Sequence, residues 1–347
     1  MSTTVKVTSF GVHPDGPAHK FTLTNAKGNT VELTDIGAAI CSIVVPDNSG
    51  KPTDIVLFHD TFEAAVENNG HMGAVCGRIA GRIANGEFKL NGKIYKIAKK
   101  HLEFSLHGGI VGFSLKLWEH EVTDGSVTFR LVSPDGDQGY PGTLTAEVKY
   151  TWSDDDRLTL DYSATTDADT IVNLTNHVYF NLNGHDDGEI LGHTITLFCD
   201  KYIPMAPNIC PIGELRDVAG TNMDFTETRT FGERINNDDE QLKIAGGYDF
   251  SYVLRDGEGV KLCARVTGEK TGITVDTYTD RQGVHLYTGN NMAPLTGKGG
   301  VKYDRRYAFC LETQNFPDAI NQPGFPSPIL RKGDEYRTRT VYAFSNE

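Results

Sequence analysis

Long apolar runs are missing from this chain of 347 residues. No stretch approaches the roughly 18 consecutive apolar residues that a bilayer-spanning helix requires. The first ten residues, MSTTVKVTSF, also lack the charged segment and the apolar core of a secretory leader. We therefore expect a cytoplasmic protein that has no membrane partner.

Closely spaced cysteine pairs are also missing. The six cysteines are scattered along the chain: Cys41, Cys76, Cys199, Cys210, Cys263 and Cys310. Zinc ribbons and thioredoxin-like redox sites need CxxC pairs and so have no support. We expect free thiols in a reducing compartment.

Several catalytic signatures are absent as well. The chain has no HxH or HExxH zinc motif and no GxSxG nucleophile elbow. The glycine-rich stretches 76–86 and 297–300 lack the Lys-Ser/Thr ending of a phosphate-binding loop. We therefore predict no metal site and no cofactor.

Positive charge is in short supply, with 33 Lys and Arg against 46 Asp and Glu, which gives a formal net charge of −13. This balance argues against nucleic acid and anionic membrane surfaces as partners. What the chain does have is 37 glycines, 14 tyrosines and 17 phenylalanines, with few long helical patterns. That composition favours an all-β protein with many turns and a neutral or weakly polar ligand.

Strand-like segments follow one another along most of the chain. They alternate or run apolar and are separated by turn residues, at 20–24, 30–35, 40–46, 87–90, 93–97, 127–133, 144–153 and 157–165. Asn91-Gly92 between two of them predicts a type I′ hairpin. Helices are predicted only at 60–69 and 228–235. These patterns indicate a single antiparallel sandwich domain over residues 1–347, with a cleft on one face of a sheet.

A carboxylate inside an apolar strand is the most informative feature. In the run 307–312, Tyr307, Phe309 and Leu311 share one face, and Glu312 lies on the other with small neighbours. A buried carboxylate has a raised pKa, which brings it toward the range of a general base at neutral pH. The alternative is a structural ion pair with Arg305 or Arg306.

The segment 171–180 predicts a strand with a polar wall. One face carries Asn173, Thr175, His177 and Tyr179, which could hydrogen-bond a polyhydroxylated ligand. His177 is a plausible general acid there, because imidazole titrates near neutrality. The alternative is a solvated outer face of an antiparallel sheet.

Three further positions are weaker candidates on their own. His107 precedes two glycines that allow a sharp turn. Arg78 and Arg82, four residues apart, could clamp sugar hydroxyls or hold carboxylates. Asp249 follows two glycines and could bind adjacent hydroxyls or only cap a turn. Asp249 with Glu312 could also supply the two carboxylates of a glycosidase.

Five motifs together resemble a known family. They are GRIAGRI (77–83), LHGG (106–109), DGDQGYPG (135–142), NLTNHVYFNL (173–182) and LETQN (311–315). In this order they closely resemble the aldose 1-epimerases, or galactose mutarotases, over nearly the whole chain. The resemblance implies a large antiparallel β-supersandwich and interconversion of the α and β anomers of free aldohexoses, above all galactose and glucose, in hexose metabolism.

The resemblance also implies roles for individual residues. Glu312 matches the base that takes the proton from the C1 hydroxyl, and His177 matches the acid that protonates the ring oxygen. His107 would support the developing charge near that oxygen. The remaining matches would bind substrate hydroxyls or line the pocket: Arg82, Asp249 and Tyr179. An acid and a base suffice for this reaction, which agrees with the absence of metal and nucleotide motifs.

Two positions depart from the family pattern. Gly81 stands where the family often has Asn, and Arg281 stands where it often has Gln. Arg281 would place a fixed charge near the sugar, which makes a sugar-phosphate epimerase an alternative. A non-catalytic sugar-binding module is another, although binding alone does not require an acid and a base. We expect a monomer or a weak dimer.

Overall fold

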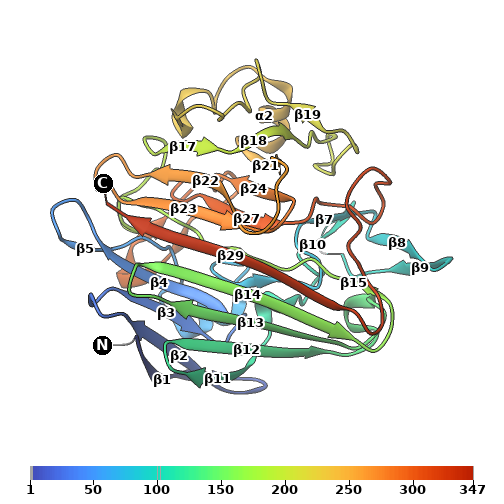
Figure 1. Cartoon of the computed structure of the whole chain (residues 1–347), viewed down its shortest axis with the longest axis horizontal. Helices are drawn as coiled ribbons and strands as arrows, with labels where there is room; N and C mark the ends of the chain where they lie inside the picture. The colour runs from blue at the N-terminus through green and yellow to red at the C-terminus, as the bar shows by residue number, and fades with distance from the viewer. Residues whose placement is uncertain (1–2, 100, 102, 347) are drawn as a thin grey trace.

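Antiparallel sheets make up most of the structure, a computed structural model that describes residues 3–99, 101 and 103–346 (Figure 1). The largest sheet has nine strands, and its C-terminal strand β29 lies in the middle of it. In spatial order the strands are β11 (Glu119–Thr123), β12 (Ser126–Ser133), β13 (Leu144–Trp152), β14 (Arg157–Thr166), β29 (Glu335–Ser345), β23 (Thr274–Thr279), β22 (Lys261–Thr267), β17 (Thr194–Leu197) and β20 (Arg229–Thr230).

Two five-stranded sheets accompany the large one. The N-terminal sheet contains β1 (Thr4–His13), β2 (Gly16–Thr24), β3 (Thr30–Thr34), β4 (Ala39–Pro46) and β5 (Pro52–Asp54). The other has the order β19 (Arg216–Asp217), β18 (Cys199–Tyr202), β21 (Asp249–Leu254), β24 (Gly283–Tyr287) and β27 (Cys310–Gln314). One apolar cluster joins all three sheets, with Phe21 of β2, Tyr150 of β13 and Phe250 of β21 fully buried in it. This packing confirms the predicted sandwich.

Short strand pairs, α-helices and 3₁₀ turns make up the remaining regular structure of the described residues. The pairs are β7 (Arg82–Ala84) with β10 (Phe104–Leu106), β6 (Val75–Cys76) with β16 (Thr175–Asn176), β8 (Glu87–Leu90) with β9 (Lys93–Lys96), β15 (Thr170–Ile171) with β28 (Ile329–Leu330), and β25 (Leu295–Thr296) with β26 (Lys302–Tyr303). The α-helices are α1 (Phe62–Glu67) and α2 (Glu240–Ala245), and 3₁₀ turns occur at Phe113–Leu115, Asp137–Gly139, Phe231–Glu233 and Lys298–Gly300. No described helix is both long and apolar enough to cross a membrane.

The local strand predictions are largely confirmed. The eight predicted segments fall on β2, β3, β4, β8, β9, β12, β13 and β14. Asn91 and Gly92 both have positive φ, and Leu90 pairs with Lys93, as a two-residue I′ hairpin requires. All six cysteines are free and buried, which confirms the expected free thiols.

Three secondary-structure predictions need correction. The helix predicted at 60–69 is confirmed in its centre by α1, but 228–235 forms β20 and a 3₁₀ turn instead. The sequence analysis missed α2, which Asp239 caps by accepting from the amides of Gln241 and Leu242. The segment 171–180 is strand only in β15 and β16, because it pairs in turn with β28, with β6 and with Phe309.

Arg78 is a buried cation that organises the loop after β12. Its guanidinium donates to the carbonyls of Pro134, Pro141 and Gly142 at 2.8–3.0 Å, and to both oxygens of Ser133. Burial lowers its pKa to about 10, so it stays charged at neutral pH. The arginine pair was predicted to clamp sugar hydroxyls or to hold carboxylates. Arg78 does neither, because it binds backbone carbonyls.

We expect Arg78→Lys to lower the free energy of unfolding by about 2–4 kcal/mol. A lysine keeps the charge but cannot reach this spread of acceptors, so buried carbonyls lose their partners. Urea denaturation measures the effect. Arg130→Lys is the matched control, because Arg130 is exposed on β12 and lies 3.8 Å from Glu147, and it should cost less than about 0.5 kcal/mol. Equal, small losses in both variants would contradict this role for Arg78.

Candidate active site

A cavity of about 1000 Å³ gathers most of the predicted functional residues. Strand register explains part of this convergence. In the sheet of β21, β24 and β27, His285 pairs with Glu312, and Asp249 pairs with Tyr287. Other segments supply the facing wall. The lining residues include Gly81, Arg82, His107, His177, Tyr179, Asp249, His285, Glu312 and Gln314.

Glu312 is buried and lies beside His177. Its side chain is 3% exposed, and its Oε1 is 3.6 Å from Nε2 of His177. Burial raises its pKa to about 7, and the nearby negative charge of Asp249 adds to the rise. Arg305 and Arg306 both donate to the carbonyl of Gly246 instead. The structural ion pair considered from the sequence is therefore wrong.

His177 is a neutral imidazole in the free site. Burial lowers its pKa to about 3, and the neighbouring His71 and His285 lower it further. Its ring stacks on Tyr179 with centroids 5.0 Å apart. Asn173, Thr175 and Tyr179 are also at most 5% exposed, so the alternative of a solvated outer face is wrong.

The Glu312 and His177 pair therefore holds one proton between pH values of about 3 and 7. Two such closely placed groups titrate as a unit, so the proton belongs to the pair. Within the described residues, Oε2 of Glu312 and Nδ1 of His177 have no hydrogen-bond partner. Both atoms are buried without a partner in residues that line the cavity.

Asp249 is fixed by two partners. Arg82 donates to its Oδ2 at 2.9 Å, and Nε2 of His285 lies 2.6 Å from its Oδ1. Burial alone would raise the pKa of Asp249, but the charge of Arg82 and the hydrogen bond of His285 lower it below the usual range. Asp249 is thus an ionised acceptor with both oxygens engaged. Because partners hold both oxygens, Asp249 is better suited to a binding role than to that of the second carboxylate of a glycosidase.

His285 is a cavity residue that the sequence analysis missed. Its Nδ1 lies 2.8 Å from Oγ of Ser251, which leaves Nε2 for Asp249. A signal was present, because Val284 and Leu286 are apolar and His285 interrupts them. The same pattern had singled out Glu312.

His107 has its orientation set by the backbone. Its Nδ1 accepts from the amide of Gly81 at 3.2 Å, so in the neutral ring the proton is on Nε2. Burial, with His71 and His177 nearby, holds the pKa of His107 well below its usual value. Glycine is required at 108, where φ is +93° and a Cβ would lie 1.8 Å from the carbonyl oxygen of Gly77. His107 is therefore a neutral donor with Nε2–H.

Comparison with known proteins identifies the family. The family model for aldose 1-epimerase matches residues 19–343. The chain belongs to the aldose 1-epimerase family. It is 39% identical to galactose mutarotase of Rattus norvegicus over 97% of this chain and 98% of that protein. It is 40% identical to galactose mutarotase of Homo sapiens over 91% of each.

A solved structure supports the same assignment. The aldose epimerase homologue from C. elegans superposes with a TM-score of 0.84 at 30% identity, covering 92% of this chain and 97% of that one. The family consists of isomerases, and this member keeps the predicted acid and base in one cavity. The suspected family and the fold class are thereby confirmed.

The two positions that depart from the family pattern differ in location. Gly81 lines the cavity, with the side chains of Pro317 and Gln314 nearest to the place of a Cβ. Arg281 is not among the described lining residues; it donates to Oδ1 of Asn173 at 3.0 Å and lies over the ring of Tyr336. Its predicted contact with the sugar therefore needs correction, because its guanidinium is held elsewhere.

Three of these residues also form a possible ligand set. Ligand atoms of His107, His177 and Glu312 lie within 4.8 Å of one another, and imidazole and carboxylate are zinc donors. The predicted acid and base roles need the same side chains as proton carriers. The predicted absence of a metal stays a prediction.

We expect Glu312→Gln to be more stable than the wild type above pH 7. The folded-state pKa of about 7 exceeds the ordinary value of 4.5, so ionising Glu312 costs folding free energy that grows from pH 4.5 and is complete above pH 7. Gln resembles the protonated form and avoids that cost, worth up to about 3 kcal/mol. Urea denaturation at pH 5 and pH 8 measures the difference. A gap that is the same at both pH values would contradict the raised pKa.

Proposed function

We propose that this chain interconverts the α and β anomers of free aldohexoses such as D-galactose and D-glucose. The observation that carries the proposal is the buried Glu312 carboxylate, 3.6 Å from the imidazole of His177 in the cavity. Membership of the family and relatives called galactose mutarotase over nearly the whole chain support the same reaction. A cytoplasmic location and a monomeric or weakly dimeric state remain part of the proposal.

Ring opening needs one proton to leave O1 and one to reach O5. Glu312 removes the O1 proton as the C1–O1 double bond forms, and the C1–O5 bond breaks with its electron pair going to O5. In the tautomer of the one-proton pair that reacts, Glu312 is ionised and the proton is on His177, which delivers it to O5. The low pKa of His177 in the free site makes its protonated form a strong acid.

Ring closure reverses each transfer. After rotation about C1–C2, O5 attacks the other face of C1, His177 recovers the O5 proton, and Glu312 returns its proton to O1. The pair carries one proton before and after the cycle, so no external acid or base is consumed. Each positioned group supplies about 10²–10⁴-fold in rate.

The remaining predicted residues hold the sugar. Ionised Asp249 accepts from hydroxyls, and Arg82 donates to them while it fixes Asp249. The Nε2–H of His107 supports the charge on O5, in line with a donor aimed at a developing oxyanion. Tyr179 donates its own hydroxyl to the carbonyl of Gly70, so it contributes its ring face beside His177.

The cavity charge disfavours a sugar phosphate. Among the described lining residues, Arg82 is the lone Arg or Lys side chain and is paired with Asp249, whereas Glu67, Glu103 and Glu312 add negative charge. A phosphate dianion would find little compensation there. Arg281, which had suggested that alternative, lies outside the lining.

Polarimetry of freshly dissolved α-D-galactose tests the reaction and its base together. The protein should accelerate the approach to the anomeric equilibrium, and Glu312→Gln should lose at least about 10²-fold of that rate. The stability gain expected for this variant above pH 7 shows that the loss is not unfolding. Wild-type turnover in Glu312→Gln would remove the base assignment, while an inactive wild type would favour a binding module that has the family's pocket.

The pH dependence of kcat/KM should shift in the variant Asp249→Asn. The productive pair carries one proton, so kcat/KM should fall as pH rises through about 7. Asp249→Asn removes a charge that raises the pKa of Glu312 and frees Arg82, which lowers it. The alkaline limb should shift to lower pH, and KM should rise as a hydroxyl acceptor is lost. An unmoved limb would show that Asp249 does not act on the pair.

A further inference from the structure

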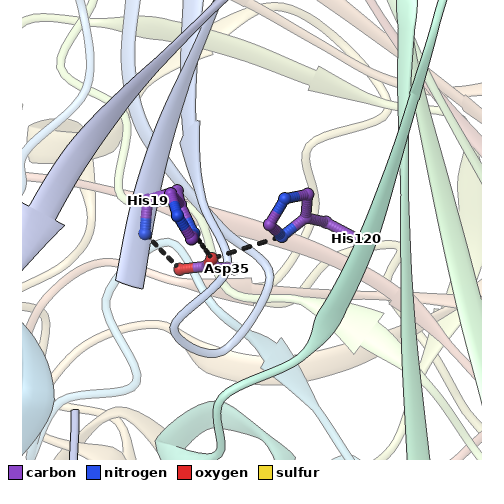
Figure 2. A group of neighbouring side chains, drawn as sticks. All are labelled: His19, Asp35 and His120. Atoms are coloured by element: carbon purple, nitrogen blue, oxygen red, sulfur yellow. Dashed lines mark hydrogen bonds and ion pairs between the residues drawn. The ribbon is translucent and has the colours of Figure 1, made fainter. Parts of the chain in front are cut away.

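A group of metal-ligating side chains lies apart from the cavity. His19 on β2, Asp35 just after β3 and His120 on β11 bring one ligand atom each to within 4.8 Å of one another. Figure 2 shows both imidazoles directed at the same carboxylate. None of the three lines the cavity described above.

The distances fit one small ion. Nδ1 of His19 lies 2.8 Å from Oδ2 of Asp35, and Nδ1 of His120 lies 3.4 Å from the same oxygen. Tetrahedral zinc with bonds of 2.0–2.2 Å places its ligands about 3.3 Å apart. Small side-chain rotations would therefore suffice to admit an ion between the three atoms.

The ligands are held by the backbone around them. The amide of His19 donates to Oδ1 of Asp35 at 2.8 Å, which leaves Oδ2 directed at the two imidazoles. The amide of Trp118 donates to the carbonyl of Asp35 at 2.9 Å, which ties the start of β11 to this position. Such prior placement lowers the entropy cost of binding an ion.

The solvent exposure of the three side chains suits a metal site. The Asp35 side chain is 1% exposed, while the His19 and His120 side chains are 28% and 29% exposed. A buried carboxylate supplies negative charge, and the partly open imidazoles leave a path for the ion and room for water as a fourth ligand. Two nitrogens and one oxygen favour zinc and similar transition metals over magnesium or calcium.

We propose that His19, Asp35 and His120 bind a divalent transition-metal ion, with Zn²⁺ as the ion to be tested. The bound ion joins β11, the edge strand of the nine-stranded sheet, to the N-terminal five-stranded sheet. Packing already links the two sheets here, because Phe21 contacts both His120 and Phe129 edge-on. The ion adds a cross-link to this contact and stabilises the folded chain.

Equilibrium dialysis of the full chain against Zn²⁺ after chelator treatment, with the metal counted by mass spectrometry, tests the site. Wild type should bind zinc and show a raised Tm. His120→Gln and, as a second variant, His19→Gln should bind at least about tenfold more weakly and lose the rise in Tm. The matched control is His13→Gln, because His13 also lies beside an aspartate, Asp15, but outside this ligand group.

The cavity contains a second group of possible zinc ligands, so zinc bound there must be distinguished from zinc bound at His19, Asp35 and His120. His177→Asn removes one member of the group of His107, His177 and Glu312 and should keep the zinc-dependent rise in Tm. Zinc binding that survives in His120→Gln and His19→Gln but disappears in His177→Asn would overturn the proposal. So would a wild-type chain that binds no zinc. A chain that binds no zinc would leave the proposed sugar reaction untouched, and polarimetry tests that reaction separately.

Discussion

Burial of the Glu312 carboxylate is the constraint on which the rest of the site depends. A charge on this strand has little water around it, so its pKa rises to about 7. Among the nearby groups, Asp249 raises this pKa further, whereas His285 and Arg82 lower it. Burial therefore remains the leading influence on Glu312. The hydrogen bonds of Arg82 and His285 hold Asp249 ionised in the same cavity.

Local features of the fold could be predicted from the sequence because local rules decide them. Alternation located strands such as β13 and β14, and Asn91-Gly92 specified its turn. The same rule placed Glu312 and His177 on inward faces, although the segment of His177 is not a continuous strand. Residues of both parities are buried in this segment, and its pairing partner changes from β6 to Phe309 along its length.

Features set by contacts distant in sequence could not be predicted. Arg78 binds a loop some 55 residues away, and its neighbours in the chain carry no sign of those carbonyls. Arg281 has the same parity as His285, so alternation alone would turn it inward. The strand begins only at Gly283, however, and the preceding turn directs Arg281 to Asn173 and Tyr336. The α2 helix differs, because its caps Asp239 and Gly246 are local signals that the sequence does contain.

Several imidazoles lie close together near Glu312, and burial also accounts for the neutral state of His107 and His177. His71, His107 and His177 lie in ring contact, and a charged ring beside another would be costly. Burial keeps His107 and His177 neutral, so the pair of Glu312 and His177 can carry a single proton without competition from His107. A reaction that must run equally well in both directions needs such a pair, because each member has to be acid in one half and base in the other. Arg82 is a permanent cation in the cavity and lowers the pKa of Glu312, but it is paired with Asp249, and burial still sets that pKa at about 7.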